Sequence, residues 1–255
     1  MNKNNKLLMY NKLAWLWPAF SPAEDYVNET KYFAGILRKH SKIKIKDVLH
    51  IGCGGGHNDF TLKKYFNVTG VDISPEMLSL ARKLNPECGY IRSDMRSMKL
   101  GRKFDAVVAF DSINHINTRK DLLAVFSSVN LHLNPGGVFL AFIENVPETL
   151  KQNSTDWFSG EYNGRHVTVI ENEFDRDTKD DVFEIRFVYI IHGKKKTDIY
   201  SECHVNGLFR LNTWKSLLSK SGFIPELMPV KSKSFPSDKK YYIAVCTKNL
   251  INPLF

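Results

Sequence analysis

The stretch VLHIGCGGGHNDF, residues 48–60, joins a short apolar run to four glycines within five positions. Glycine has unusual backbone freedom, and its lack of a side chain allows tight turns and the close approach of a ligand. A turn alone needs one such glycine, so four of them directly after a strand-like run indicate a ligand that lies on bare backbone. These glycines are Gly52, Gly54, Gly55 and Gly56.

Around this stretch, apolar strand-like runs alternate with helical patterns from residue 46 to residue 144. Near-continuous apolar runs are typical of parallel strands whose two faces are both covered by helices. Ser74 is the expected N-cap of the second helix, because Pro75 follows it at the first turn. The sequence predicts strands at 47–51, 68–71, 90–91, 104–110 and 138–143, helices at 58–65, 75–84 and 119–133, and a turn at 134–137.

The pattern changes after Glu144, where long β-rich runs separated by polar turns predict an antiparallel meander. A helix that ends near Gly222 and two further strands follow. The expected fold is therefore α/β, with a mostly parallel seven-stranded sheet, helices on both of its faces and the meander inserted before the last helix. The predicted runs of the meander are 166–174, 182–192 and 197–209, the last helix is 213–221, and the last strands are 223–228 and 241–246.

The composition describes a globular chain, since 43% of its 255 residues are hydrophobic and can fill a large core. Its net charge of +9 comes from dispersed basic residues without an RNA-binding motif, so nucleic acid is a disfavoured partner. No apolar run approaches the roughly 20 residues of a membrane helix, and the basic N-terminus precedes no small-residue cleavage site. The four cysteines lack metal-binding spacing. We expect a cytoplasmic protein with reduced thiols, no metal and a small-molecule partner, and the sequence leaves a homodimer open.

Two kinds of nucleoside ligand compete for the glycine loop. The dinucleotide fingerprint GxGxxG requires a small third residue, and counting from Gly52 that position holds His57, which would crowd the contact between helix and strand. Asp72 lies at the end of the second predicted strand, where a carboxylate can accept both ribose hydroxyls. The two positions together favour a nucleoside ligand other than NAD.

The successive motifs GCGGG, VDIS, SDM and NPGG resemble those of class I S-adenosylmethionine-dependent methyltransferases, which implies a Rossmann-like fold. More narrowly, the chain resembles the nucleotide-sugar N,N-dimethyltransferases over nearly its whole length. The resemblance implies an N-terminal helical lid at 1–40, a cofactor-binding core at 41–150, an acceptor-side β insertion at 151–210 and a C-terminal part of the core at 211–255. The narrower resemblance rests on EDYVNET (24–30), SDMRSMKLGRKFDAVV (93–108), PGGVFLAFIENVPET (135–149) and YSECHVNGLFR (200–210).

The same resemblance implies S-adenosylmethionine as cofactor, lying over the glycine loop and the carboxyl ends of the strands. Family members usually carry Asp or Glu two residues before the first loop glycine, where this chain has His50. A histidine can hydrogen-bond the loop backbone but supplies no fixed negative charge near neutral pH, so weaker cofactor binding or an inactive relative is expected. The implied cofactor contacts are Tyr10, Gly52, Cys53, Gly54, Gly56, Asp72, Ile73, Asp94, Met95 and Phe110.

For the acceptor, the resemblance implies a polar amine such as an amino sugar. An amine must only be neutral when it attacks, whereas a hydroxyl acceptor needs a base, for which His115 and His204 are the candidate catalytic residues. Tyr200, Glu202 and His204 alternate onto one strand face and predict a polar acceptor wall.

Other side chains have two interpretations. Arg165, Arg186 and Arg210 could bind a phosphorylated acceptor or could lie on solvated strand faces. The lid aromatics Trp15 and Trp17 could cover the cofactor or only attach the segment to the core. The alternative functions are an O-methyltransferase, an RNA methyltransferase and an inactive S-adenosylmethionine-binding protein.

Overall fold

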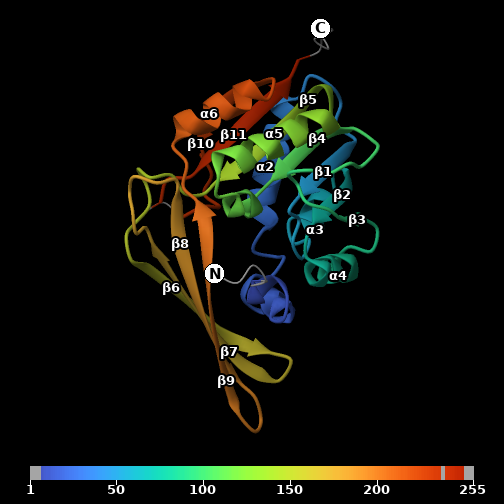
Figure 1. Cartoon of the computed structure of the whole chain (residues 1–255). Coiled ribbons are helices and arrows are strands. Elements are labelled where there is room, and N and C mark those ends of the chain that lie inside the picture. The colour runs from blue at the N-terminus through green and yellow to red at the C-terminus, as the bar shows by residue number, and fades with distance from the viewer. Residues whose placement is uncertain (1–6, 237–238, 250–255) are drawn as a thin grey trace.

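The computed structural model describes residues 7–236 and 239–249, and within them a seven-stranded sheet forms the main layer (Figure 1). Its strand order is β10-β11-β5-β4-β1-β2-β3, with β11 antiparallel to both of its neighbours and the other adjacent pairs parallel. The predicted fold class is confirmed. The strands are β1 (Asp47–Ile51), β2 (Asn67–Asp72), β3 (Gly89–Arg92), β4 (Phe104–Ala109), β5 (Leu133–Ile143), β10 (Phe223–Pro229) and β11 (Tyr242–Lys248).

Helices cover both faces of this sheet, as the apolar strands predict (Figure 1). On one face, Phe126 of α5 and Trp214 of α6 share a core cluster with Phe139 of β5. On the other face, Phe33 and Leu37 of α2 share a core cluster with Val108 of β4. The helices are α2 (Val27–His40), α3 (Asp59–Leu62), α4 (Pro75–Leu84), α5 (Arg119–His132) and α6 (Leu211–Lys220), with a short 3-10 helix η3 (Asp111–His115) after β4.

A second sheet of four antiparallel strands, in the order β6-β7-β8-β9, extends away from the main sheet at the lower left of Figure 1. Three of its strands lie where the sequence predicts them, whereas β6 was not predicted. Its segment holds Gly160 and polar residues on both faces, so it lacks the regular alternation that marks a half-buried strand. The strands are β6 (Ser154–Tyr162), β7 (Arg165–Phe174), β8 (Val182–His192) and β9 (Thr197–Gly207).

The N-terminal segment covers the inner face of the second sheet. Met9, Leu13 and Leu16 are buried there in one cluster with Phe183 and Tyr189 of β8. The segment, in blue in Figure 1, therefore lies between the two sheets, where it contacts β6 of the second sheet and α4 beside the main sheet. It contains η1 (Leu8–Tyr10), η2 (Ala14–Leu16) and α1 (Trp17–Phe20) before α2 begins. Residues 1–6 of the predicted lid and 250–255 of the predicted C-terminal part lie outside the described residues.

Two local predictions need correction. The helix predicted at 58–65 is shorter, because after Leu62 the backbone tightens into turns and β2 already begins at Asn67. The turn predicted at 134–137 lies within β5, where it interrupts the pairing of β5 with β4. Phe104 pairs with Leu133, but Ala106, two residues later on β4, pairs with Val138, five residues later on β5. The glycines there allow the chain to bulge without leaving the sheet.

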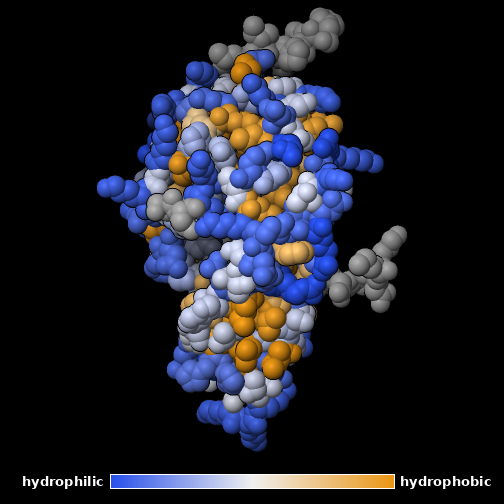
Figure 2. Space-filling model, turned by 90° about the vertical axis from the view of Figure 1, so that its left-hand side faces the viewer, coloured by the Kyte–Doolittle hydropathy of each residue, from blue (hydrophilic) through white to orange (hydrophobic). Residues whose placement is uncertain are grey.

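The surface of the second sheet is also apolar in part. Figure 2 shows hydrophobic side chains gathered on the lower half of the molecule, where this sheet lies. Among the described residues, no helix is long and apolar enough to span a membrane. The large hydrophobic side chains that are exposed on the strands of the second sheet are Trp157, Phe174, Ile199 and Val205.

Candidate functional site

The strand order reverses between β1 and β4, and ligands of open α/β sheets bind at such a point, outside the carboxyl ends of the strands. The glycine loop leaves β1 there, Asp72 ends β2, and η3 follows β4. The fold therefore brings together three segments that other strands and helices separate along the chain.

The glycine loop adopts backbone conformations that other residues avoid. Gly52, Gly54 and Gly56 have φ of +65°, +51° and +75°. A Cβ on Gly56 would lie 2.7 Å from Asn85 Nδ2 and 2.8 Å from Tyr90 Oη, so the loop also needs glycine for space. The loop presents bare backbone because side chains behind it leave no room for anything larger.

Asp72 is held firmly at the rim of this loop. Its Oδ2 accepts a hydrogen bond from Gly54 N at 2.9 Å and its Oδ1 accepts one from Ser74 N at 2.8 Å. Burial raises the pKa of Asp72, although these two donors oppose the shift. Ile73 beside it is 65% exposed, which leaves an apolar surface next to the carboxylate. The carboxylate of Asp72 can bind a ribose, and the apolar surface of Ile73 can pack against the base attached to it.

The other residues predicted to contact the cofactor differ in whether their side chains are free to bind it. Asp94 lies at the same edge but forms an ion pair with Arg96, which lowers the pKa of Asp94. Met95 packs its Cε near Gly52. The side chains of Cys53 and Phe110 are buried below the site, so these residues present backbone to it.

His50, the departure from the family pattern, forms a buried pair that sequence reasoning missed. Its Nδ1 lies 2.7 Å from Oδ1 of Asp59, and both side chains are almost fully buried. The other oxygen of Asp59 accepts a hydrogen bond from Tyr90 Oη at 3.0 Å. Position 50 thus has a carboxylate as a buried partner, and Nδ1 of His50 bonds this side chain and not the loop backbone.

The N-terminal segment lies over the glycine loop and extends to the neighbouring cavity. The carbonyl of Tyr10 accepts a hydrogen bond from Ser74 Oγ at 2.5 Å, and Trp17 lies against Gly55. His57, which disfavoured a dinucleotide, packs between Trp17 and Tyr26. Trp15 instead stacks on Tyr162 at the second sheet, so the two tryptophans differ in place.

A cavity of about 490 Å³ lies between the N-terminal segment, the carboxyl end of the main sheet and the inner face of the second sheet. It contains both predicted catalytic histidines. Four of its carboxylates come from four different elements or loops: Glu29, Asp111, Glu144 and Glu171. Among the described residues, no three His, Cys, Asp or Glu side chains gather closely enough to hold a metal ion.

The cavity is strongly acidic, because within the described residues its carboxylates outnumber the cation beside them, Lys239. Burial and the neighbouring carboxylates raise the pKa of Glu171 to about 8 and that of Glu29 to about 7. Desolvation and then the charges of Glu144 and Glu29 raise the pKa of Asp111 well above its ordinary value, and its side chain lines the cavity, where it is exposed. Lys239, whose Nζ lies 3.4 Å from Glu144 Oε1, is the cation that partly opposes the shift at Asp111.

The two histidines meet Tyr10 in a cluster of three rings. Tyr10 Oη lies 2.9 Å from His115 Nε2, and the ring centroids of His115 and His204 are 5.6 Å apart. Burial, and then the charge of His204, lowers the pKa of His115 to about 4. His115 is thus a neutral imidazole at physiological pH and a weak base. The oxygen Oδ1 of Asn206, also at this cavity, is buried without a hydrogen-bond partner in the described structure.

The predicted polar wall is only partly correct. Tyr200, Glu202 and His204 share one face of β9, as alternation requires, but the middle of the wall is apolar because β8 contributes Ile185 and Phe187. Glu202 does not reach the acceptor: it accepts hydrogen bonds from the backbone of Leu8 and Met9 and from Tyr189 Oη. Sequence alternation identifies a face of one strand but not its neighbours across the sheet.

None of the carboxylates that line the cavity is among the site residues predicted from the sequence: Asp25, Glu29, Asp111, Glu144 and Glu171. Glu29 and Glu144 lie inside the motifs EDYVNET and IENVPET that carry the narrower resemblance, so those motifs were the available signal. Glu171 had none, because it is one of several acidic residues on a β-rich run. Glu171 lines the cavity because it lies on β7 directly opposite Phe187 of β8, which also lines the cavity.

The comparisons with known proteins agree with this geometry. Residues 48–137 match the family model described as a methyltransferase domain. The fold, the glycine loop and this match identify the chain as a methyltransferase of the S-adenosylmethionine-dependent class, as the sequence predicts.

Within that class, the chain is similar to two sugar enzymes. It is 28% identical over 227 residues to dTDP-3-amino-3,4,6-trideoxy-alpha-D-glucopyranose N,N-dimethyltransferase of Streptomyces venezuelae, covering 87% of this chain and 92% of that one. It is also 28% identical to dTDP-3-amino-3,6-dideoxy-alpha-D-glucopyranose N,N-dimethyltransferase of Streptomyces fradiae, covering 81% and 80%. The crystal structure of Streptomyces venezuelae DesVI superposes with a TM-score of 0.75 at 25% identity, covering 91% of this chain and 95% of that chain.

Proposed function

We propose that this chain transfers a methyl group from S-adenosylmethionine to the nitrogen of a polar amine, an amino sugar carried on a nucleotide. The single observation that carries the choice of an amine is the acidic cavity beside the glycine loop. A cation is the ligand that such a cavity favours, because carboxylates crowded into one cavity repel one another and a cation relieves that repulsion. The two sugar relatives, which are named for amino sugars, support the same acceptor.

The residues at the carboxyl edge of the sheet fit the cofactor. When bound, S-adenosylmethionine supplies an electrophilic methyl group. Asp72 would accept its ribose hydroxyls, Ile73 would pack on its base, and the backbone of residues 52–56 would lie beneath its amino acid end. Tyr10 belongs to both sites, since its backbone contacts Ser74 and its ring lines the cavity.

The carboxylates of the cavity can bind the amine and take its proton. An amine arrives protonated at neutral pH and must lose a proton before its lone pair can attack. A base works best when its pKa lies near the working pH, which describes Glu171 at about 8 and Glu29 at about 7 better than His115 at about 4. We assign proton transfer to the carboxylates and give His115 and His204 the positioning of Tyr10 and the acceptor.

The proposed roles divide the chain into four parts. Residues 41–150 and 211–255 form the cofactor-binding sheet, residues 151–210 wall the acceptor, and residues 1–40 close the site from above. The burial of Met9, Leu13 and Leu16 on the second sheet supports a segment that connects the acceptor side with the cofactor side.

Asp111→Asn tests the proposal, because asparagine resembles the protonated carboxyl and should leave the fold intact. We expect a fall of about 100-fold in kcat/KM for an amino sugar nucleotide, the cost of losing one charged contact in a desolvated site. Affinity for S-adenosylhomocysteine should stay the same. Mass spectrometry of the product reports methylation, and exposed Glu161→Gln is the matched control.

The pH profile provides a second readout. As pH rises from about 6 to 8, Glu29 and then Glu171 lose their protons, so kcat/KM for the amine should rise over that range. A panel in which catechols or fatty acids are methylated while amino sugars are inert contradicts the amine acceptor and leaves the cofactor assignment standing.

A further inference from the structure

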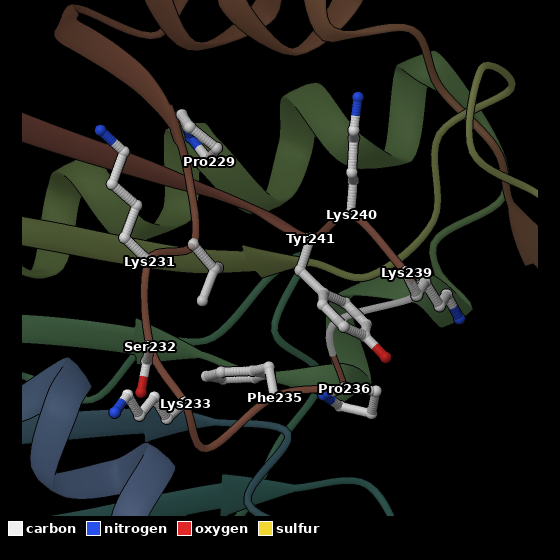
Figure 3. A pocket seen from close by; sticks show the side chains of 10 residues that line it. Pro229, Lys231, Ser232, Lys233, Phe235, Pro236, Lys239, Lys240 and Tyr241 are labelled. Atoms are coloured by element: carbon white, nitrogen blue, oxygen red, sulfur yellow. The ribbon is translucent and has the colours of Figure 1, made fainter.

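A second cavity, of about 600 Å³, adjoins the acidic one and has the opposite charge. Four lysines of the segment between β10 and β11 line it: Lys231, Lys233, Lys239 and Lys240. Figure 3 shows Lys231 and Lys240 extending the same way in that view, on either side of Pro229. We call this cavity, lined by residues 229–233, 235–236 and 239–241, the lysine pocket.

Three of the four lysines have no carboxylate partner. Lys239 is the exception, since it lies beside Glu144 of the acidic cavity. Lys231, Lys233 and Lys240 are exposed and form no ion pair within the described residues. Their charges are therefore available to an anion that comes from outside.

The arginines that the sequence singled out for a phosphorylated acceptor are committed elsewhere. Arg210 pairs with Glu148, Arg186 lies 3.5 Å from Glu184, and Arg165 lies over the ring of Trp15. None of the three lines either cavity. The lysines of the lysine pocket, and not these arginines, therefore line a cavity next to the acceptor site.

The two cavities share a wall made of Phe235, Pro236 and Tyr241, whose two rings lie 5.5 Å apart. A ligand that reaches past this wall meets carboxylates at one end and ammonium groups at the other. A molecule with a cationic amine and a phosphate group matches both ends at once, whereas an uncharged sugar matches neither.

We infer that the lysine pocket binds the phosphate groups of the nucleotide that carries the proposed amino sugar acceptor. This inference rests on the proposed function, because it places the amine of the same molecule in the acidic cavity. The lysines act on affinity for the acceptor and take no part in methyl transfer. Phe235 and Tyr241 belong to the wall that the lysine pocket shares with the acidic cavity.

Binding of thymidine diphosphate tests the pocket without requiring turnover. In the presence of S-adenosylhomocysteine, calorimetry should show thymidine diphosphate binding at least tenfold more tightly than thymidine. Lys231→Gln with Lys240→Gln should weaken it at least tenfold, and higher salt should weaken the wild-type complex further. Lys194→Gln with Lys195→Gln, exposed in the turn between β8 and β9, is the matched control and should change nothing.

The outcomes separate the pocket from the proposed function. If thymidine diphosphate binds the lysine variant and the wild type equally, or if the control variant weakens it as much, the pocket assignment is wrong even when amines are methylated. Tighter binding of a single-stranded RNA than of thymidine diphosphate, lost in the same variant, also overturns it. If the pocket behaves as expected but no amine is methylated, the proposed function fails by itself.

Discussion

The cofactor edge and the acceptor cavity lie side by side but are built in opposite ways. At the cofactor edge, Asp72 already receives two backbone hydrogen bonds, and the glycines hold their conformation with side chains packed behind them. In the acceptor cavity, Asp111 and Glu171 face other carboxylates, and burial raises their pKa. The first site is therefore complete before its ligand arrives, whereas the second is a group of mutually repelling carboxylates whose repulsion a cationic ligand relieves.

The largest effect is expected at the complete site. Asp72→Ala removes the acceptor for the ribose and also the partner of Gly54 N, so it should weaken binding of S-adenosylhomocysteine by about 1.5 to 3 kcal/mol. Titration calorimetry measures the change. Asp47→Ala, at the opposite end of the strands, is the control and should bind normally. An Asp72 variant with normal affinity would show that the cofactor edge does not depend on this carboxylate.

A smaller effect should expose the strain of the acceptor cavity. The folded-state pKa of Glu171, about 8, lies above its ordinary value of 4.5, so the folded protein holds a proton that the unfolded chain releases. Wild-type stability should therefore fall as pH rises from about 4.5 to 8. Glu171→Gln should be more stable than wild type by about 2 kcal/mol at pH 9 and about equal at pH 5, by urea unfolding. An equal difference at both pH values contradicts a strained carboxylate.

The smallest effect is expected where the two regions are joined. Burial alone would raise the pKa of Glu202, but His204, whose Nε2 lies 3.3 Å away, and hydrogen bonds from Tyr189 and Met9 N keep it below its ordinary value. The ionised carboxylate holds the N-terminal segment. Glu202→Gln should weaken cofactor binding by about 1 kcal/mol and speed tryptic cleavage after Lys12. Glu184→Gln removes only partly exposed ion pairs and serves as control. Unchanged cleavage would mean that Glu202 does not hold the segment.

The regular elements of the cofactor half could be predicted closely from the sequence. Ser74 is the N-cap of α4 as expected and accepts the hydrogen bond of Met77 N, and β1 has its predicted bounds. These features depend on local chemistry, namely a capping oxygen, a proline at the first turn and a run of apolar residues. They need no information about distant segments.

The cofactor ligand was also encoded locally, because the glycine loop and Asp72 follow consecutive strands, β1 and β2, that are neighbours in the sheet. The sequence alone therefore predicts most helices and strands of the cofactor half and the class of cofactor. The composition of the acceptor site depends on the tertiary structure. Its carboxylates Glu29, Asp111, Glu144 and Glu171 are distributed along the chain from α2 to β7, and they line one acidic cavity only when the second sheet folds against the first. The sign of a buried charge's effect depends on which groups surround it, and those neighbours come from distant segments.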